Sequence, residues 1–326
     1  MKPIWWLEDY ERIRDDCSSV ELPTWSRIEL NGTDRARLLN SLGTNRLDDL
    51  TVGEGRETFL TDAKGRVVAH GLVFAEEETT SFVTAASRTE TIVHHLQRYI
   101  IREDVQVSDR SAQTAIWYLG GRRCEEVLQD LGLPVPREQG EHVTATAANS
   151  PVKVCRVAMA GPVGFLLITS REHARAVAAA FQQAGIRTSV RQAFEAARIQ
   201  WGWPLDRVDI SSENFPQEVG RDEQAISFTK GCYLGQETVA RIDSLGHVNK
   251  RLSLVRFPSG KLAASASLSV EGKPVGATTS MGYSPEFSCP VALAYVRHEC
   301  CVPGTQLESS IGKAGIVPFR RLAGVS

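Results

Sequence analysis

The sequence predicts an α+β protein in which two similar lobes are followed by a small C-terminal β-barrel. Length is the first observation, because a chain of 326 residues with 42% hydrophobic residues exceeds the size at which one core normally keeps growing. The second is a succession of strand-type and helix-type segments that occurs once before about residue 112 and again after it. The third is a change to short strands with Gly, Ser and Pro turns beyond Lys250. We therefore expect lobes over about 1–112 and 113–245, forming one region, and a barrel over 246–326.

The first lobe is expected to open with a strand and a capped helix. The segment SRIELNG has strand character, and TDRARLLNSLG begins with a capping Thr33 or Asp34 and ends at Gly43. Turn residues then separate four predicted strands, which are RETFLTD, AKGRV, VVAHGLVFA and TTSFVTAA. The amphipathic run RTETIVHHLQRYI predicts a helix, and DVQVSD predicts the strand after it.

The second lobe repeats this theme from residue 114 onward. Its predicted elements are strand TAIWYLG, helix RRCEEVLQDLG, strand VKVCRVA, a Gly–Pro hairpin, strand GFLLITS and helix REHARAVAAAFQQAG. A further helix, VRQAFEAARIQWG, leads into a stretch that shows no clear periodicity and extends to about Glu237. Because that stretch contains several Trp and Phe residues, it is too aromatic for disorder and is predicted to be an ordered loop that lines a site. The barrel strands are expected within RLSLVRF, SLSVEGKPVGATTS and CPVALAYVR.

Composition excludes some classes of function. The 37 basic and 39 acidic residues give a net charge of −2, which argues against a protein whose main work is to grip nucleic acid. The acidic start MKPIWWLEDYERIRDDC lacks the pattern of a secretion signal, and no run approaches the ~18 apolar residues of a membrane span. We expect a soluble cytoplasmic protein without membrane contact. The seven scattered cysteines contain no CxxC pair, so neither a disulfide framework nor a zinc ribbon is predicted.

One cluster near the C-terminus has metal-binding residue types. His298, Cys300 and Cys301 lie within four positions, but neighbouring residues of a strand point to opposite faces and cannot easily share one ion. No metal site is therefore predicted.

The segment TKGCYLGQE carries the main chemical signal. Cys232 is nucleophilic only as a thiolate, and both Lys230 and a helix that starts at about Gln236 would favour that form. Gly231 and Gly235 permit positive φ angles and the close approach of a ligand or a neighbouring chain. A structural interpretation is equally coherent, in which Lys230 neutralises a carboxylate and the glycines only shape a turn.

Two further features of this segment have structural alternatives. Glu237 and Arg241 are spaced as a pair on one helix face. Gln236 either hydrogen-bonds a ligand or caps the loop.

The run KGCYLGQETVAR, with NFPQE and ISF before it and Lys250–Arg251 after it, resembles the signature of the YgfZ-type folate-binding proteins, which are related to the glycine-cleavage T-protein. The resemblance extends over LNGTDRARLLNSLGTNRLDDLTVGEG, TDAKGRVVAHGLVF, ARIQWGWP and the residues after 250. It implies an aminomethyltransferase-like fold of three units around a central channel that holds tetrahydrofolate. It also implies a role in maintaining iron–sulfur proteins, including enzymes that modify tRNA. The expected partners are iron–sulfur client proteins, with no direct contact to nucleic acid, and the expected state is a monomer.

The resemblance also assigns ligand positions. Trp25 stands at a ligand-facing tryptophan and Phe194 at a second aromatic position, and for both the alternative is a core residue. Thr84 takes the place of an asparagine near the folate. Gln217 and Glu218, after Pro216, either line the same channel or satisfy loop backbone.

Two sites, which together comprise three residues, depart from the T-protein pattern. Ala69 and His70 stand where relatives have an aspartate pair in the first hairpin, and neither is a permanently ionised acid at neutral pH. Gln200 replaces the glutamate that would pair with the pterin, so the charge-assisted strength of that hydrogen bond is lost. Glycine-cleavage aminomethyl transfer is therefore disfavoured.

Three functions remain open. The first is a YgfZ-like folate-dependent protein in which Cys232 lies near the folate and handles a one-carbon or oxidised adduct. If it is an enzyme, it is expected to be a one-carbon transferase-like protein that uses this thiol. The second is a true aminomethyltransferase or demethylase of the T-protein class, and the third is a non-catalytic scaffold for client proteins.

Overall fold

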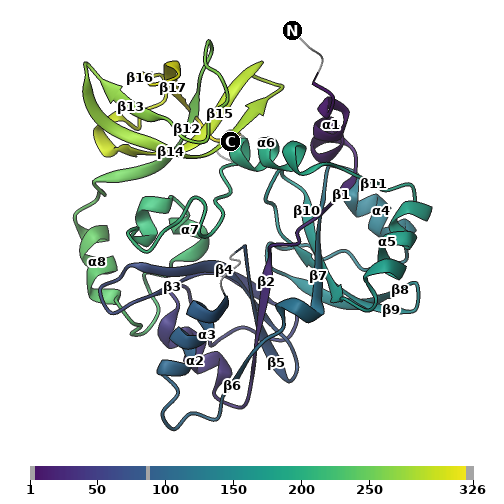
Figure 1. Ribbon diagram of the computed structural model, residues 1–326. Coiled ribbons are helices and arrows are strands. Elements are labelled where there is room, and N and C mark those ends of the chain that lie inside the picture. The colour runs from purple at the N-terminus through teal and green to yellow at the C-terminus, as the bar shows by residue number, and fades with distance from the viewer. Residues whose placement is uncertain (1–3, 86–88, 321–326) are drawn as a thin grey trace.

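The computed structural model describes residues 4–85 and 89–320. It has the predicted architecture: two α+β lobes, each with its own antiparallel-rich sheet, and a closed barrel of six strands. In Figure 1 the purple-to-blue first sheet lies at the bottom, the second sheet at the right and the yellow-green barrel at the top left. The central helix α6 (Arg191–Trp201) runs between the barrel and the second lobe, where the three units meet.

The first sheet is antiparallel throughout and is covered by two helices. Its strands in spatial order are β3 (Gly55–Thr61), β4 (Val67–Ala75), β5 (Thr79–Thr84), β2 (Ser26–Asn31) and β6 (Gln106–Asp109). Helices α2 (Arg35–Leu42) and α3 (Thr89–Arg98) contribute Leu39, Leu42, Ile92 and Leu96 to its core. Gly43 ends α2 as predicted. The strand predicted for AKGRV is wrong. This segment forms most of the β3–β4 turn, in which Gly65 has a φ of +75°.

The second sheet includes the first strand of the chain. Its order is β11 (Arg187–Thr188), β1 (Ser18–Glu21), β7 (Thr114–Gly120), β10 (Gly164–Ser170), β9 (Ser150–Arg156) and β8 (His142–Ala147). Its helices are α4 (Cys124–Asp130) and α5 (Ala174–Gln183), and η1 (Ser111–Gln113) precedes β7. Helix α1 (Leu7–Asp15), which the sequence did not reveal, packs on α6 beside this sheet. The residues before about 22 therefore pack with the second lobe, although they precede the first in the chain.

The stretch predicted as a long loop contains short helices. These are η2 (Pro216–Val219), α7 (Asp222–Ala225) and α8 (Gln236–Ser244). They enclose a small apolar core with β3 and β4 that includes Phe59, Val67, Val219, Tyr233 and Val239. The stretch is thus ordered, as predicted, and it is packed against the first sheet (Figure 1).

The barrel closes in the order β12 (Lys250–Arg256), β15 (Cys289–Arg297), β14 (Lys273–Ser284), β13 (Ser267–Val270), β16 (Gln306–Ser309) and β17 (Gly312–Val317). His298–Cys300 forms the 3-10 helix η3, so the strand geometry assumed for that cluster is wrong. Within the described residues, no group of His, Cys, Asp and Glu is arranged to hold a metal ion. Among the helices of 4–85 and 89–320, none combines the length and apolar composition of a membrane span.

A buried arginine joins the central helix to its surroundings. Arg198 on α6 donates to Asp209 Oδ2 at 3.1 Å, to the Trp203 carbonyl at 3.1 Å and to Ser280 Oγ of β14 at 2.7 Å. Because the guanidinium is almost fully buried, these bonds replace the water that it gives up on folding. The α6 helix, the following segment and the barrel are therefore held in one fixed arrangement.

Candidate functional site

Lys230 anchors the Cys232 loop to the first lobe. Its side chain is buried, and Nζ donates to the carbonyls of Asn40, Gly43 and Asn45 at 2.6, 2.7 and 2.7 Å. Two of these acceptors lie at the end of α2, where carbonyl groups lack helical partners. Burial lowers the pKa of Lys230 to about 8. The ammonium therefore fixes backbone from two regions, a role that differs from both the predicted thiolate partner and the predicted carboxylate partner.

The residues around Cys232 hold the loop on both sides of the thiol. Tyr233 is buried in the core beneath α8, and Leu234 exchanges backbone contacts with the first lobe, accepting from Thr61 Oγ1 at 2.6 Å. Gly235 has a φ of +80° and lies so close to the β3–β4 turn that a Cβ would meet the Asp62 carbonyl at 2.5 Å. Cys232 itself is exposed. The loop is thus fixed in place while its thiol remains in solvent.

Gly231 and Gly235 have different roles. The predicted close approach of a neighbouring chain occurs at Gly235, which immediately precedes α8 at the predicted helix start, Gln236. Gly231 does not have a positive φ, and a Cβ added there would meet nothing within 4 Å. The positive φ that a glycine permits is therefore not adopted at Gly231.

The remaining candidate residues of this region lie on η2 and α8. Glu237 and Arg241 are both exposed, and no ion pair joins them within the described part of the chain. Gln217 donates from Nε2 to the Val239 carbonyl of α8 at 2.7 Å, and its buried Oε1 has no hydrogen-bond partner there. Glu218 accepts from Asn214 Nδ2 at 3.0 Å and from the Phe215 N–H at 3.3 Å. For Gln217 and Glu218 these contacts match the interpretation in which they satisfy loop backbone.

A small cavity, which we call the central cavity, brings together two of the predicted ligand residues, Trp25 and Thr84. Trp25, His70, Thr84 and Trp203 are among its lining residues, and its volume is about 10 Å³. A second cavity of about 20 Å³ lies on the other side of Trp25, beside Phe194. Neither lining includes Cys232 or any other residue of 229–237. The sequence placed the thiol near the folate position, whereas these cavities are separate from the exposed loop.

His70 belongs to a buried ionic network. Its Nε2 lies 2.8 Å from Glu57 Oε1, and the same carboxylate forms a two-pronged ion pair with Arg221, whose Nε is 2.7 Å from Oε1. Burial alone would raise the pKa of Glu57, but the Arg221 guanidinium and the hydrogen bond from His70 lower it to about 2. Arg221 also stacks on the Trp203 ring at 4.7 Å. The position at which the resemblance implies an acid is therefore occupied by an imidazole that is already paired with Glu57.

Asp206 supplies a buried carboxyl group beside this network. It is 2% exposed, its Oδ1 accepts the Arg207 N–H at 3.0 Å, and Oδ2 has no hydrogen-bond partner among the described residues. Burial raises its pKa to about 6, although the neighbouring Arg207 and His70 act in the opposite direction. Sequence reasoning missed this group because nothing in WPLDRVD distinguishes a buried aspartate from a loop residue. An acid two residues after a Trp–Pro pair was the available signal.

Gln200 faces another part of the core. Its Nε2 donates to Tyr10 Oη at 2.8 Å and to the Ala196 carbonyl at 3.0 Å, and its Oε1 accepts from Ser284 Oγ at 2.8 Å. It is fully buried. Because all these groups are satisfied, the amide joins α1, α6 and the barrel and is not free to pair with a ligand.

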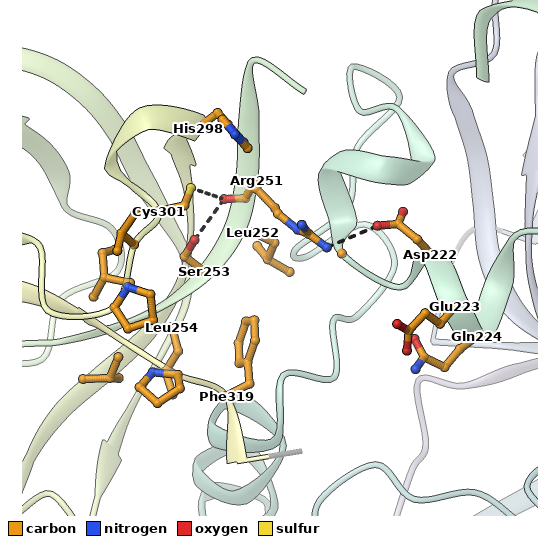
Figure 2. A pocket seen from close by; sticks show the side chains of 16 residues that line it. Asp222, Glu223, Gln224, Arg251, Leu252, Ser253, Leu254, His298, Cys301 and Phe319 are labelled. Carbon is orange, nitrogen blue, oxygen red and sulfur yellow. Dashed lines mark hydrogen bonds and ion pairs between the residues drawn. The ribbon is translucent and has the colours of Figure 1, made fainter. Parts of the chain in front are cut away.

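The larger cavities lie at the edge of the barrel. One of about 570 Å³ runs between α7 and strands β12 and β17, and another of about 670 Å³ lies beside Arg66, Phe215 and Lys250. Figure 2 shows the first, where Arg251 reaches across to Asp222 Oδ2 at 3.2 Å, while Ser253 and Cys301 lie against the Arg251 carbonyl. None of the predicted ligand residues Trp25, Phe194, Gln200 and Thr84 lines either cavity.

The central cavity matches a flat heterocycle in chemistry but not in size. Two indole side chains, a threonine hydroxyl and the nearby unpaired carboxylate oxygen of Asp206 are groups that recognise a ring with N–H donors. However, 10 Å³ is about the space of one water molecule, and ligand pockets have volumes of about 300–1,000 Å³. In this arrangement the site does not accommodate a pteridine.

Two α+β lobes and a six-stranded barrel, joined through a central helix, define the aminomethyltransferase-like class of fold. The chain belongs to the glycine cleavage T-protein family: residues 4–230 match the GCVT N-terminal domain, and residues 250–323 match the glycine cleavage T-protein C-terminal barrel domain. The T-protein relationship expected from the sequence is thus confirmed.

Relatives match along most of the chain. A chloroplastic protein of Arabidopsis thaliana with a provisional transferase name is 26% identical over 301 residues, which cover 91% of this chain and 69% of the relative. An aminomethyltransferase of Mycobacterium avium is 29% identical over 295 residues, covering 89% and 80%. The crystal structure of the glycine cleavage system aminomethyltransferase T from Bartonella henselae superposes with a TM-score of 0.85 over 98% of this chain and 90% of that one, at 19% identity. This last similarity shows the fold.

Proposed function

We propose that this protein is a YgfZ-type member of the T-protein family that binds a reduced folate between its lobes and supports the assembly or repair of iron–sulfur proteins through Cys232. The observation that carries the proposal is the TKGCYLGQE loop. Lys230, Tyr233 and Gly235 fix it to the first lobe and leave the thiol exposed. A fixed, accessible thiol is suited to reaction with a group presented by another protein.

The geometry around Ala69 and His70 disfavours aminomethyl transfer, the activity in the names of the bacterial relatives. Ala69 has no functional group, and the His70 imidazole is paired with Glu57, whose carboxylate is itself paired with Arg221. A second carboxyl group near His70 is that of Asp206, which comes from a different part of the chain. We infer that this chain has left the glycine-cleavage reaction while retaining the fold.

Folate binding requires the central site to open. Trp25, Thr84 and Trp203 are the residues that would hold the pteridine, and a bound reduced folate would supply a carrier for one-carbon units. Since Trp25 lies between the two small cavities, displacement of its indole would join them. Binding is therefore expected to change the tryptophan fluorescence of the protein.

Titration with tetrahydrofolate under anaerobic conditions tests this part of the proposal. We expect saturable heat with the native protein and a loss of at least tenfold in affinity for Trp25→Ala. Trp5→Ala is the matched control, because Trp5 is 73% exposed and lies outside the site. Absence of saturation by the native protein at millimolar ligand would refute folate binding.

A second experiment tests the thiol. In cells that lack the protein, Cys232→Ser is expected to abolish support of iron–sulfur enzyme activity, whereas Cys300→Ser, at a partly exposed thiol of the barrel, is expected to retain it. Full activity of Cys232→Ser would instead favour the non-catalytic scaffold, which the small size of the central cavity also favours. We further propose that the client proteins bind directly, that any effect on tRNA modification is indirect and that the protein acts as a monomer.

A further inference from the structure

Two buried thiols lie next to each other where α1 ends and α4 begins. The Sγ atoms of Cys17 and Cys124 are 3.5 Å apart, although 107 positions separate the residues in the sequence. Cys17 is 6% exposed and Cys124 is fully buried. Both are free thiols within an apolar core that includes Leu119 and Leu128.

The neighbouring backbone fixes this contact. The Arg123 N–H donates to the Asp16 carbonyl at 2.9 Å, and the Arg123 guanidinium reaches Asp16 Oδ1 at 3.1 Å. At Gly121 the two segments approach so closely that a Cβ would lie 2.1 Å from the Asp16 carbonyl oxygen. The residues immediately before each cysteine are therefore paired, so the thiols face each other across a fixed interface.

We propose that Cys17 and Cys124 form a reversible disulfide when the protein meets a peroxide. A disulfide has an S–S length of about 2.05 Å, so the sulfurs must approach by roughly 1.5 Å, which side-chain torsions can supply. One thiol attacks the peroxide, forming a sulfenic acid and releasing water or an alcohol. The second thiol displaces the sulfenic oxygen as water, so two electrons pass to the peroxide, and a low-molecular-weight thiol restores the reduced pair.

The environments of the two sulfurs indicate which thiol attacks the peroxide first. Burial, together with the contact to Cys17, raises the pKa of the Cys124 thiol far above its usual range, which makes it a poor first nucleophile. Cys17 is the more exposed of the two. Cys17 is therefore the attacking residue and Cys124 the resolving residue.

The bond would join two segments of the second lobe and close a loop that contains the whole first sheet. The 106 residues from 18 to 123 lie between the cysteines and contain every strand of the first sheet. It would also fix the end of α1, whose Tyr10 is hydrogen-bonded to Gln200 on the central helix. Oxidation would thus hold α1 in the position that covers Gln200. This inference does not depend on folate binding.

Peptide mapping tests the bond directly. The full-length protein is treated with hydrogen peroxide, the remaining thiols are alkylated, and trypsin is added without reductant. Cleavage at arginine releases residues 15–27 and 124–137, each of which contains a single cysteine. We expect a linked pair of these peptides that disappears after reduction. Recovery of both as alkylated or singly oxidised peptides at high peroxide would overturn the proposal.

Thermal unfolding provides a second measurement that does not depend on the variants folding equally well. Each protein is compared with itself, oxidised and reduced. The native protein and Cys232→Ser are expected to gain about 5 °C or more on oxidation, because closure of a long loop restricts the unfolded chain. Cys17→Ser and Cys124→Ser should show no gain. An equal gain in either of these variants would assign the effect to other thiols and overturn the proposal.

Discussion

The centre of the molecule and the Cys232 loop are each built around a buried cation, and the two cations act differently. Arg221 pairs with a carboxylate that also binds His70, and it stacks on Trp203, so the polar groups of the centre are largely bound to one another. Lys230 donates to three neutral carbonyl groups of the first lobe, and its ammonium lies 5.0 Å from the centre of the Tyr233 ring. Its charge therefore fixes backbone and leaves the neighbouring thiol free to react. The polar groups of the centre thus stabilise the arrangement in which the central cavity is small. Lys230, in contrast, fixes a loop that presents the Cys232 side chain.

Replacing Arg221 with methionine is expected to have the largest effect on stability, because it removes the central cation. The substitution leaves the buried Glu57 carboxylate without its main partner, and we expect a loss of about 3–5 kcal/mol in the free energy of unfolding. Urea denaturation measures it. Arg251→Met is the matched control: its ion pair with Asp222 is half exposed, so the loss should be below about 1 kcal/mol. Equal losses in the two variants would show that the central network is no more stabilising than a surface pair.

Replacing Lys230 with methionine tests the loop. Three carbonyls lose a charged donor, and we expect a loss of about 3 kcal/mol in unfolding free energy. The more specific result is local: hydrogen exchange should accelerate in residues 229–235 and around Gly43, and alkylation of Cys232 should change with it. If exchange in both segments stays unchanged, the ammonium does not anchor the loop.

Most of the fold was predictable because its signals are local. The alternating apolar residues of SRIELNG and TTSFVTAA and the helical spacing of TDRARLLNSLG each produced the expected element. Helix α1 was missed because LEDYERIRD is mainly polar and buries only Tyr10 and Ile13. The pairing of β1 with β7 is a contact between distant segments, which the period of a single strand does not reveal.

The site was less predictable for the same reason. The sequence identified the Cys232 loop and the special glycine at 235, both of which are local features. It could not identify the contact of Lys230 with residues 40–45 or the pairing of Glu57 with Arg221 across 164 positions. The burial of Asp206 likewise depends on segments that approach each other only in the folded protein.

Replacing Asp206 with asparagine tests whether the centre contains a strained acid. An acid whose pKa rises from 3.8 to about 6 on folding contributes stability that is complete below pH 4 and is lost as pH rises through about 6. The neutral amide avoids this loss, so the stability of the variant relative to the native protein should be higher at pH 8 than at pH 4 by about 3 kcal/mol. Thermal unfolding between pH 4 and 8 measures the difference, which should shrink toward acid pH. A difference that does not vary with pH would mean that Asp206 titrates normally.

The smallest expected effect concerns Tyr10 of α1, which is hydrogen-bonded to Gln200. Tyr10→Phe removes the hydroxyl that accepts from Gln200 Nε2, while the bonds to Ala196 and Ser284 remain, so the loss of unfolding free energy should be about 1 kcal/mol. If α1 limits access to the centre, the variant should bind tetrahydrofolate faster in stopped-flow fluorescence, with the Trp25 site unchanged. Tyr99→Phe, on the first lobe and outside this contact, is the control. An unchanged association rate would show that the centre opens at Trp25 without movement of α1. Ligand binding would then be independent of α1, the helix that a Cys17–Cys124 disulfide would fix.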